Sequence, residues 1–92
     1  MATLAVETFD VASTNEVTPL SELPLGAEAH VVAVLEPGAL GERLMELGLT
    51  VGTRVQVLRR GLFGDPVQLR LRGFMLSLRK QQALAIRVRP AT

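Results

Sequence analysis

The sequence predicts a mainly β protein, a small barrel of about five strands with one or two short helices. The chain has 92 residues, which is enough for one domain with a thin core. Several short segments after residue 26 alternate apolar with polar residues, as half-buried strands do. Glycines and prolines that favour turns separate these segments. Short strands between such turns are typical of all-β sandwiches and barrels.

The first 17 residues show neither a helical nor a strand period. We therefore expect a flexible leader over residues 1–17 and a barrel domain over residues 18–92. Thr18 and Pro19 have the form of a helix start, with Thr as the cap and Pro in the first turn. Pro24 would end that helix after about one turn.

A strand is expected over residues 27–35. Its odd positions, from Ala27 to Leu35, are small or apolar and are expected to face the core. His30 falls on the outer face. Because the chain has no second His and no Cys, we interpret His30 as a solvated side chain and not as a metal ligand.

A short helix is expected next, because Leu40, Arg43, Leu44 and Leu47 recur at helical spacing. Gly48 would end the helix in a left-handed conformation, which favours glycine. Residue 49, a leucine, would then fold back onto the leucine stripe.

The rest of the chain is typical of a β-meander. A loop over 61–66, a tight turn at 72–73 and one helical turn over 80–83 separate the strands. Closure of the strands into a barrel would leave no sheet edge exposed. The residues expected to face the core are Val51, Thr53, Val55, Val57, Val67, Leu69, Leu71, Leu76, Leu78, Ile86 and Val88.

Composition excludes several classes of function. No apolar run is long enough to cross a membrane, so direct membrane insertion is not expected. Without cysteine and with one histidine, the chain has no thiol nucleophile, thiolate metal site or His pair. Glu42 and Glu46 are four residues apart, and we interpret them as a solvated helix face. We expect no enzymatic activity, no catalytic residues, no cofactor and no resident metal.

Charge is divided unevenly along the chain. Seven acids and no bases precede Arg43, whereas ten bases and two acids follow from Arg43 onward. Arginines on the expected outer strand faces, such as Arg54, Arg60 and Arg70, could suit a nucleic acid. Barrels that bind single strands also use aromatic platforms, for which only Phe63 and Phe74 are available. Nucleic-acid binding, which would weaken steeply with salt, is the alternative, and no nucleic-acid partner is expected.

Protein binding fits the composition better. Leu58, Leu62, Phe63 and Met75 are apolar positions that a one-faced meander leaves partly exposed, and arginines surround them. An apolar centre with an arginine-rich rim is common in protein interfaces. The alternative is that Leu62 and Phe63 fold under their loop as a satellite of the core.

One segment carries a family resemblance. Arg43-Leu44-Met45-Glu46-Leu47-Gly48-Leu49, followed by Gly52, resembles the FeoA family of ferrous iron transport protein A. Residues 18–26, 64–66, 76–79 and 86–88 extend the resemblance over nearly the whole chain apart from the leader. The resemblance implies an SH3-like barrel. It also implies a cytoplasmic accessory protein, held at the inner face of the membrane through FeoB, the ferrous iron transporter with a cytosolic GTP-binding domain.

The hypothesis for the contact with this partner involves Arg43 together with Leu62, Phe63 and Arg79. A homo-oligomer is left open. A third interpretation is a domain that binds or senses a transition metal, which would need either carboxylates contributed by several chains or a weak oxygen site. Calorimetry with ferrous iron under anaerobic conditions would distinguish it from the accessory role.

Overall fold

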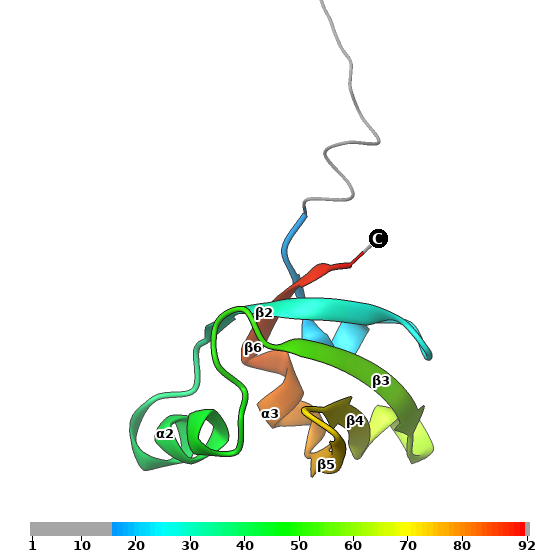
Figure 1. The fold of residues 1–92 in the computed structure, drawn as a ribbon. Helices are drawn as coiled ribbons and strands as arrows, with labels where there is room; N and C mark the ends of the chain where they lie inside the picture. Colours follow the sequence, from blue (N-terminus) through cyan, green and yellow to red (C-terminus); the bar gives the residue numbers. More distant parts are fainter. Residues whose placement is uncertain (1–15, 92) are drawn as a thin grey trace, which may run out of the picture.

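The computed structural model describes residues 16–91 and confirms the mainly β prediction (Figure 1). Apart from Glu16 and Val17, the leader expected over 1–17 lies outside the described residues. Within that part of the chain there are two α-helices, α2 (Gly38–Glu46) and α3 (Lys80–Leu84), and two short 3-10 helices, η2 (Leu20–Glu22) and η3 (Leu62–Gly64). The strands are β1 (Thr18–Pro19), β2 (Glu28–Val34), β3 (Arg54–Arg60), β4 (Val67–Leu71), β5 (Phe74–Leu78) and β6 (Ile86–Pro90).

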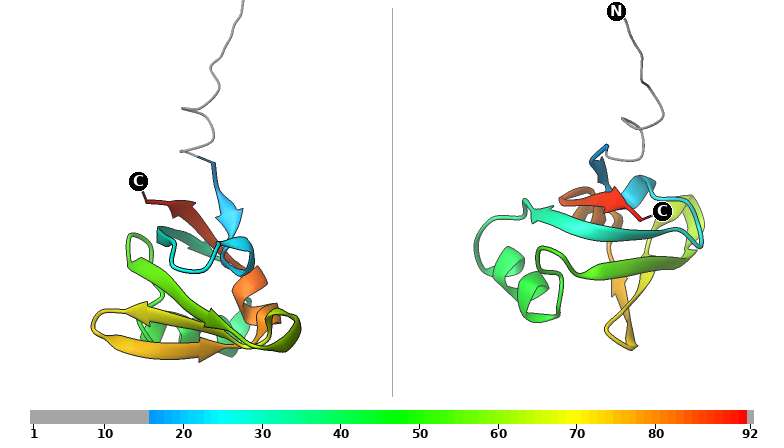
Figure 2. Two further views of the ribbon diagram at one scale, coloured as in Figure 1. Left: turned by 90° about the vertical axis from the view of Figure 1, so that its right-hand side faces the viewer. Right: turned by 45° about the horizontal axis from the view of Figure 1, so that its top comes forward.

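All six strands form one antiparallel sheet in the order β1-β6-β2-β3-β4-β5. The sheet curls around its core, with α3 inside the curve and α2 beside one end (Figures 1 and 2). β1 and β5 each pair with one strand only. The expectation that closure leaves no exposed edge is therefore wrong, and β5 ends the sheet as an edge strand.

The core follows the alternating apolar pattern most closely in β4, where Val67, Leu69 and Leu71 are all buried. Consecutive side chains of a strand point to opposite faces, so three alternate residues line the concave side. Thr53, Val55, Val57, Leu78, Ile86 and Val88 are buried as expected, and Leu76 packs against the core in part. The alternation therefore identified most of the barrel interior.

In β2 the pattern fails halfway along. Ala29 and Val31 are buried, but the pairing with β6 shifts register between Val31 and Ala33. An irregularity of this kind inserts an extra residue and changes which side chains face inward. Beyond it Val34 packs against the core, whereas Leu35 is 56% exposed. The expectation that Leu35 faces the core is wrong.

The beginning of the domain is extended rather than helical. Thr18 pairs with Val88 and Pro19 pairs with Arg87, so these residues form β1. The 3-10 helix η2 begins at Leu20 and has no side-chain cap. The expectation that Thr18 caps a helix is wrong, because β6 offers backbone partners that sequence spacing does not show.

Arg60 holds the η2 turn against the sheet. Its guanidinium donates to the backbone carbonyl of Ser21 at 2.8 Å and also to that of Leu23. Leu20 and Leu23 are buried beneath this contact. Arg60 is therefore a structural residue rather than part of a free basic surface.

Helix α2 lies where it was expected, but little of its leucine stripe is buried. Leu44 is buried, whereas Leu40 is 39% exposed. Gly48 has a φ of 114°, and Leu49 folds back into the core as predicted. Val51, which was expected to face the core, is 76% exposed because it lies in the turn before β3. The helix is thus attached to the barrel by few buried residues.

Gly41 sets how closely α2 approaches the chain that precedes it. A Cβ atom added to Gly41 would lie 1.9 Å from the backbone oxygen of Glu36. Real Cβ atoms essentially never come that close, so only glycine fits at this position. The sequence shows Gly41 as an ordinary residue of the helix, and its packing role is visible only in the structure.

The chain enters and leaves the domain on the same side. β1 runs antiparallel to β6, and the N–H of Ala91 donates to the carbonyl of Glu28 at 2.8 Å. In Figures 1 and 2 both ends lie away from α2 and from the β4–β5 hairpin. Within residues 16–91 no helix has the length and apolar character needed to cross a membrane.

Candidate protein-binding site

The 3-10 turn η3 presents two large apolar side chains to solvent. Leu62 is 79% exposed and Phe63 is 85% exposed. The alternative in which they fold under the loop is therefore wrong. Phe63 also has a φ of 58°, a left-handed conformation that a bulky residue rarely adopts. An exposed aromatic residue in such a conformation is a candidate for function.

Backbone hydrogen bonds fix the shape of this turn. The N–H of Gly64 donates to the carbonyl of Gly61 at 2.9 Å, and the N–H of Gly61 donates to that of Pro66 at 2.8 Å. A Cβ atom on Gly61 would lie 2.3 Å from the backbone oxygen of Asp65, so the loop ends approach as closely as glycine allows. The two apolar side chains are thus carried on an ordered turn.

Arg79 lies beside this turn. The Asp65 carboxylate accepts a hydrogen bond from the N–H of Lys80 at 3.0 Å, and its Oδ1 atom is 3.7 Å from Nε of Arg79. The Arg79 side chain is 77% exposed, so the ion pair leaves most of its guanidinium accessible. Asp65 directly follows η3, so this ion pair places Arg79 beside the turn that carries Leu62 and Phe63, and we call these three residues the tip cluster.

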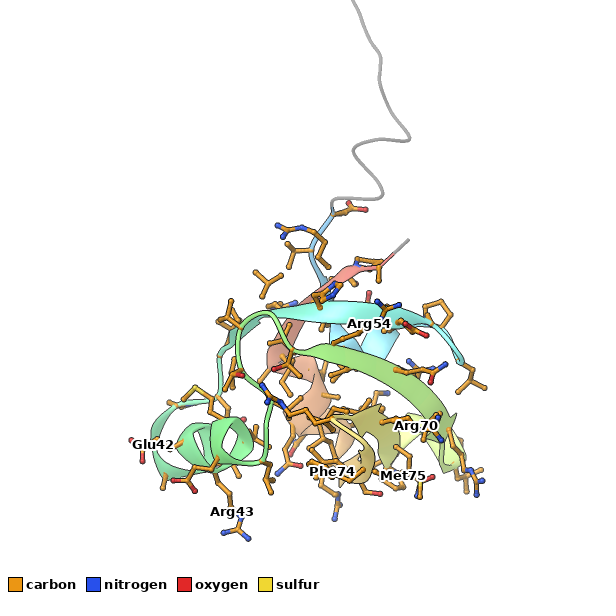
Figure 3. The ribbon with its side chains drawn as sticks, in the orientation of Figure 1. Glu42, Arg43, Arg54, Arg70, Phe74 and Met75 are labelled. Atoms are coloured by element: carbon orange, nitrogen blue, oxygen red, sulfur yellow. The ribbon has the colours of Figure 1, made fainter. Side chains whose placement is uncertain are left out.

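Arg43 lies apart from the tip cluster. It is on α2, at the opposite end of the molecule from η3 (Figures 1 and 3). The structure therefore brings together three of the four residues in the contact hypothesis and places Arg43 in a separate region.

A hollow of about 430 Å³ lies at the end of α2, next to the start of β5. Met45, Leu47 and Phe74 give it an apolar lining, and Phe74 is 43% exposed. Arg72 and Glu46 contribute the charged side chains. Sequence reasoning missed this hollow, because it forms only where α2 and the β4–β5 hairpin meet.

The outer face of β2, β3 and β4 carries a second hollow of about 260 Å³. Arg54, Arg70 and Arg72 line it together with Glu28, which forms an ion pair with Arg54. Figure 3 shows Arg54 and Arg70 on this sheet. Arg60, counted with them from the sequence, is bound to the η2 carbonyls. Two of the arginines that suggested nucleic-acid binding are therefore already engaged.

His30 is exposed on the outer face, as expected. Among residues 16–91, no three His, Asp or Glu side chains come together in a group that could hold a metal ion.

Comparison with known proteins gives the family. The family model of the FeoA domain matches residues 18–90. A fusion protein of Fe(2+) transport protein A and Fe(2+) transporter FeoB from Porphyromonas gingivalis is 35% identical over 69 residues. The match covers 75% of this chain and 8% of the fusion protein.

Solved structures agree with this result. A FeoA protein from Chlorobium tepidum is 37% identical with a TM-score of 0.77, over 82% of this chain and 71% of that one. A FeoA from Stenotrophomonas maltophilia, solved with zinc and described as an SH3 domain protein, is 33% identical with a TM-score of 0.68. That match covers 75% of this chain and 86% of the other. The SH3-like fold is thus confirmed, and the chain belongs to the FeoA domain family.

Proposed function

We propose that this protein is an accessory protein of ferrous iron transport that binds the cytosolic, GTPase-containing part of a FeoB-type transporter. The observation that carries the proposal is the fusion protein, in which a domain similar to this chain shares one polypeptide with FeoB. Joining two domains keeps each at a high effective concentration around the other, which is useful when they interact.

The proposed role is binding rather than catalysis, and it needs no cofactor. A binding protein affects a transporter only if it binds some conformations of that transporter better than others. Because the proposed contact is with the cytosolic part of the transporter, the protein would act in the cytoplasm, at the inner face of the membrane. Its effect on transport would follow the conformation that it prefers.

The tip cluster supports the proposal as the contact region. Two apolar side chains more than three-quarters exposed, with an arginine beside them, match the composition of interface centres. Leu62 and Phe63 lie outside the buried core, so the fold does not depend on packing by their side chains. Arg43, at the far end, would contact a second part of the same partner.

A pull-down with the purified cytosolic part of FeoB tests the proposal. The parental protein should be captured, and capture should persist at high salt because the contact has an apolar centre. A Leu62→Asp/Phe63→Asp double variant should bind at least tenfold more weakly, as expected when interface hot spots are lost. Val51→Asp is the matched control, since Val51 is an equally exposed apolar residue away from η3.

Circular dichroism would verify that each variant is folded. Undiminished capture of the folded double variant would exclude the tip cluster as the contact. The proposed function would be refuted if the parental protein binds under none of three conditions, namely with GDP, with a GTP analogue and without nucleotide.

A further inference from the structure

β5 is an edge strand that lacks the usual protection against pairing with another chain. Natural edge strands are kept short or carry proline, charge or a bulge. β1, at the other edge, has two residues and one of them is Pro19. β5 has five residues, Phe-Met-Leu-Ser-Leu, with no charge and no proline, and its pairing with β4 shows no register shift. The two edges of the sheet therefore differ in kind.

The hairpin register shows which backbone groups of β5 are free. The two-residue turn makes Leu71 and Phe74 a hydrogen-bonded pair. Because hydrogen-bonded pairs alternate along an antiparallel ladder, the backbone N–H and C=O groups of Leu76 and Leu78 also point toward β4. The N–H and C=O groups of Met75 and Ser77 then point away from the sheet. Within residues 16–91, neither residue has a hydrogen bond outside the β4–β5 ladder. Four backbone groups are thus available to a further strand.

The free stretch ends at α3. The N–H of Arg79 donates to Oε1 of Gln82 at 2.9 Å, and the N–H of Lys80 donates to Asp65. A strand added to β5 would therefore pair with residues 75–77 and continue past both ends without further backbone partners.

Side chains along the edge suit an apolar segment. Met75 is 63% exposed, and Phe74 lines the hollow of about 430 Å³ beside α2 (Figure 3). Consecutive side chains of an added strand would point to opposite faces of the sheet. One apolar side chain would enter the hollow next to Phe74, and its neighbours would lie beside Met75.

Charge at the ends of β5 selects between possible occupants. Arg72 precedes the strand, whereas Arg79 and Lys80 follow it. Of the two nearby acids, Asp65 is already held by Arg79 and by the N–H of Lys80, and Glu46 remains at the hollow. A second copy pairing through β5 must be antiparallel by two-fold symmetry, which would set Arg72 of each copy near Lys80 of the other. Like charges at both ends disfavour that dimer.

We infer that the β5 edge receives an extended segment of a protein partner, apolar at its centre and acidic at both ends, which pairs with residues 75–77 as an additional strand. Such addition of a strand draws its affinity from main-chain hydrogen bonds and its specificity from alternate side chains. The inference rests on the proposed function, because the segment would belong to the cytosolic part of the transporter. β5 runs from the hollow beside α2 to Arg79 of the tip cluster, so the segment would link the two regions that the structure separates.

An NMR titration of the full chain tests the inference. The probe is a blocked peptide with Val-Thr-Val at its centre and two aspartates at each end. We expect the amide resonances of Met75 and Ser77 to shift most. The same peptide with lysines for the aspartates, or with all three of its central amides N-methylated, should bind at least several-fold more weakly.

Ser77→Pro removes one outward N–H without touching the β4 ladder, and proline is tolerated there on an edge strand. It should weaken peptide binding about tenfold, the factor expected for one backbone hydrogen bond. Ser77→Ala keeps the N–H and is the matched control, with binding within about twofold of the parent. If Ser77→Pro fails to fold, the N-methylated peptide still provides the comparison.

Several results would overturn the inference. These are no shift of Met75 or Ser77 at millimolar peptide, equal binding of the N-methylated peptide, or dimerisation through β5 without any peptide. The FeoB pull-down separates the two proposals. If FeoB captures a folded Ser77→Pro variant as well as it captures the parental protein, the inference is overturned and the proposed function stays intact. If FeoB does not capture the parental protein, the proposed function is refuted.

Discussion

Replacement of Gly41 by alanine sets two opposite effects against each other. In the interior of an exposed helix, alanine is favoured over glycine by about 0.8–1 kcal/mol. If propensity decided the outcome, Gly41→Ala would stabilise the protein. The structure predicts the opposite sign, because the added methyl group would meet the backbone oxygen of Glu36.

The magnitude follows from the geometry of that contact. The Cβ atom would lie 1.9 Å from the oxygen, 1.5 Å short of the 3.4 Å at which ordinary contact begins. The obstructing atom belongs to the backbone, so it cannot move aside as a flexible side chain can. Overpacking of this kind costs about 1–3 kcal/mol. We take the upper end of that range, about 3 kcal/mol, because backbone must shift. Subtracting the gain in propensity of about 1 kcal/mol, we expect the free energy of unfolding to fall by about 2 kcal/mol.

Urea unfolding followed by far-UV circular dichroism is the suitable assay, because the chain has no Trp or Tyr for fluorescence. With an m-value near 1 kcal/mol/M, a loss of about 2 kcal/mol lowers the midpoint by about 2 M. The matched control is Glu42→Ala, one residue along and exposed, which should change the free energy by less than about 0.5 kcal/mol. A raised or unchanged midpoint for Gly41→Ala would refute the reasoning, since it would mean that α2 is free to move away from Glu36.

Two further predictions concern stability. Arg60→Met keeps the apolar stem but loses the hydrogen bonds to the η2 carbonyls, so the free energy of unfolding should fall by about 1.5–3 kcal/mol in urea titrations. Arg59→Met, at an exposed position, is its control, and equal effects of the two changes would contradict the structural role of Arg60. Phe63→Asn should raise the free energy by about 1 kcal/mol, because asparagine accepts the left-handed conformation and little packing is lost at 85% exposure. A lower midpoint for Phe63→Asn would show that the ring stabilises the fold.

The parts of the fold that depend on local alternation could be predicted from the sequence. Val67, Leu69 and Leu71 are buried because a regular strand turns every second side chain inward. Gly48 and Leu49 were also predictable, since the left-handed helix end is a local feature. Leu35 and Val51 were not, because a bulge and a turn interrupt the period where the sequence shows no break. The pairing of Thr18 with Val88 joins residues distant in sequence, and the spacing of residues along the chain does not indicate such a pairing.

The candidate site was predictable in the same uneven way. The sequence placed Leu62 and Phe63 in a loop of turn-forming residues but left open whether they are exposed or fold under that loop, and the structure shows them exposed. The proximity of Arg79 to them depends on Asp65, and the separation of Arg43 depends on where α2 packs. The free edge of β5 is a property of strand order, which only the assembled sheet defines.

The antiparallel pairing of β1 with β6 has a consequence for gene fusion. The chain enters β1 and leaves β6 on the side of the barrel that faces away from α2 and the β4–β5 hairpin (Figures 1 and 2). A second domain tethered to either end would therefore leave the hairpin sterically unobstructed. The barrel can be built into a longer polypeptide or supplied as a separate chain with the same surface presented in both arrangements.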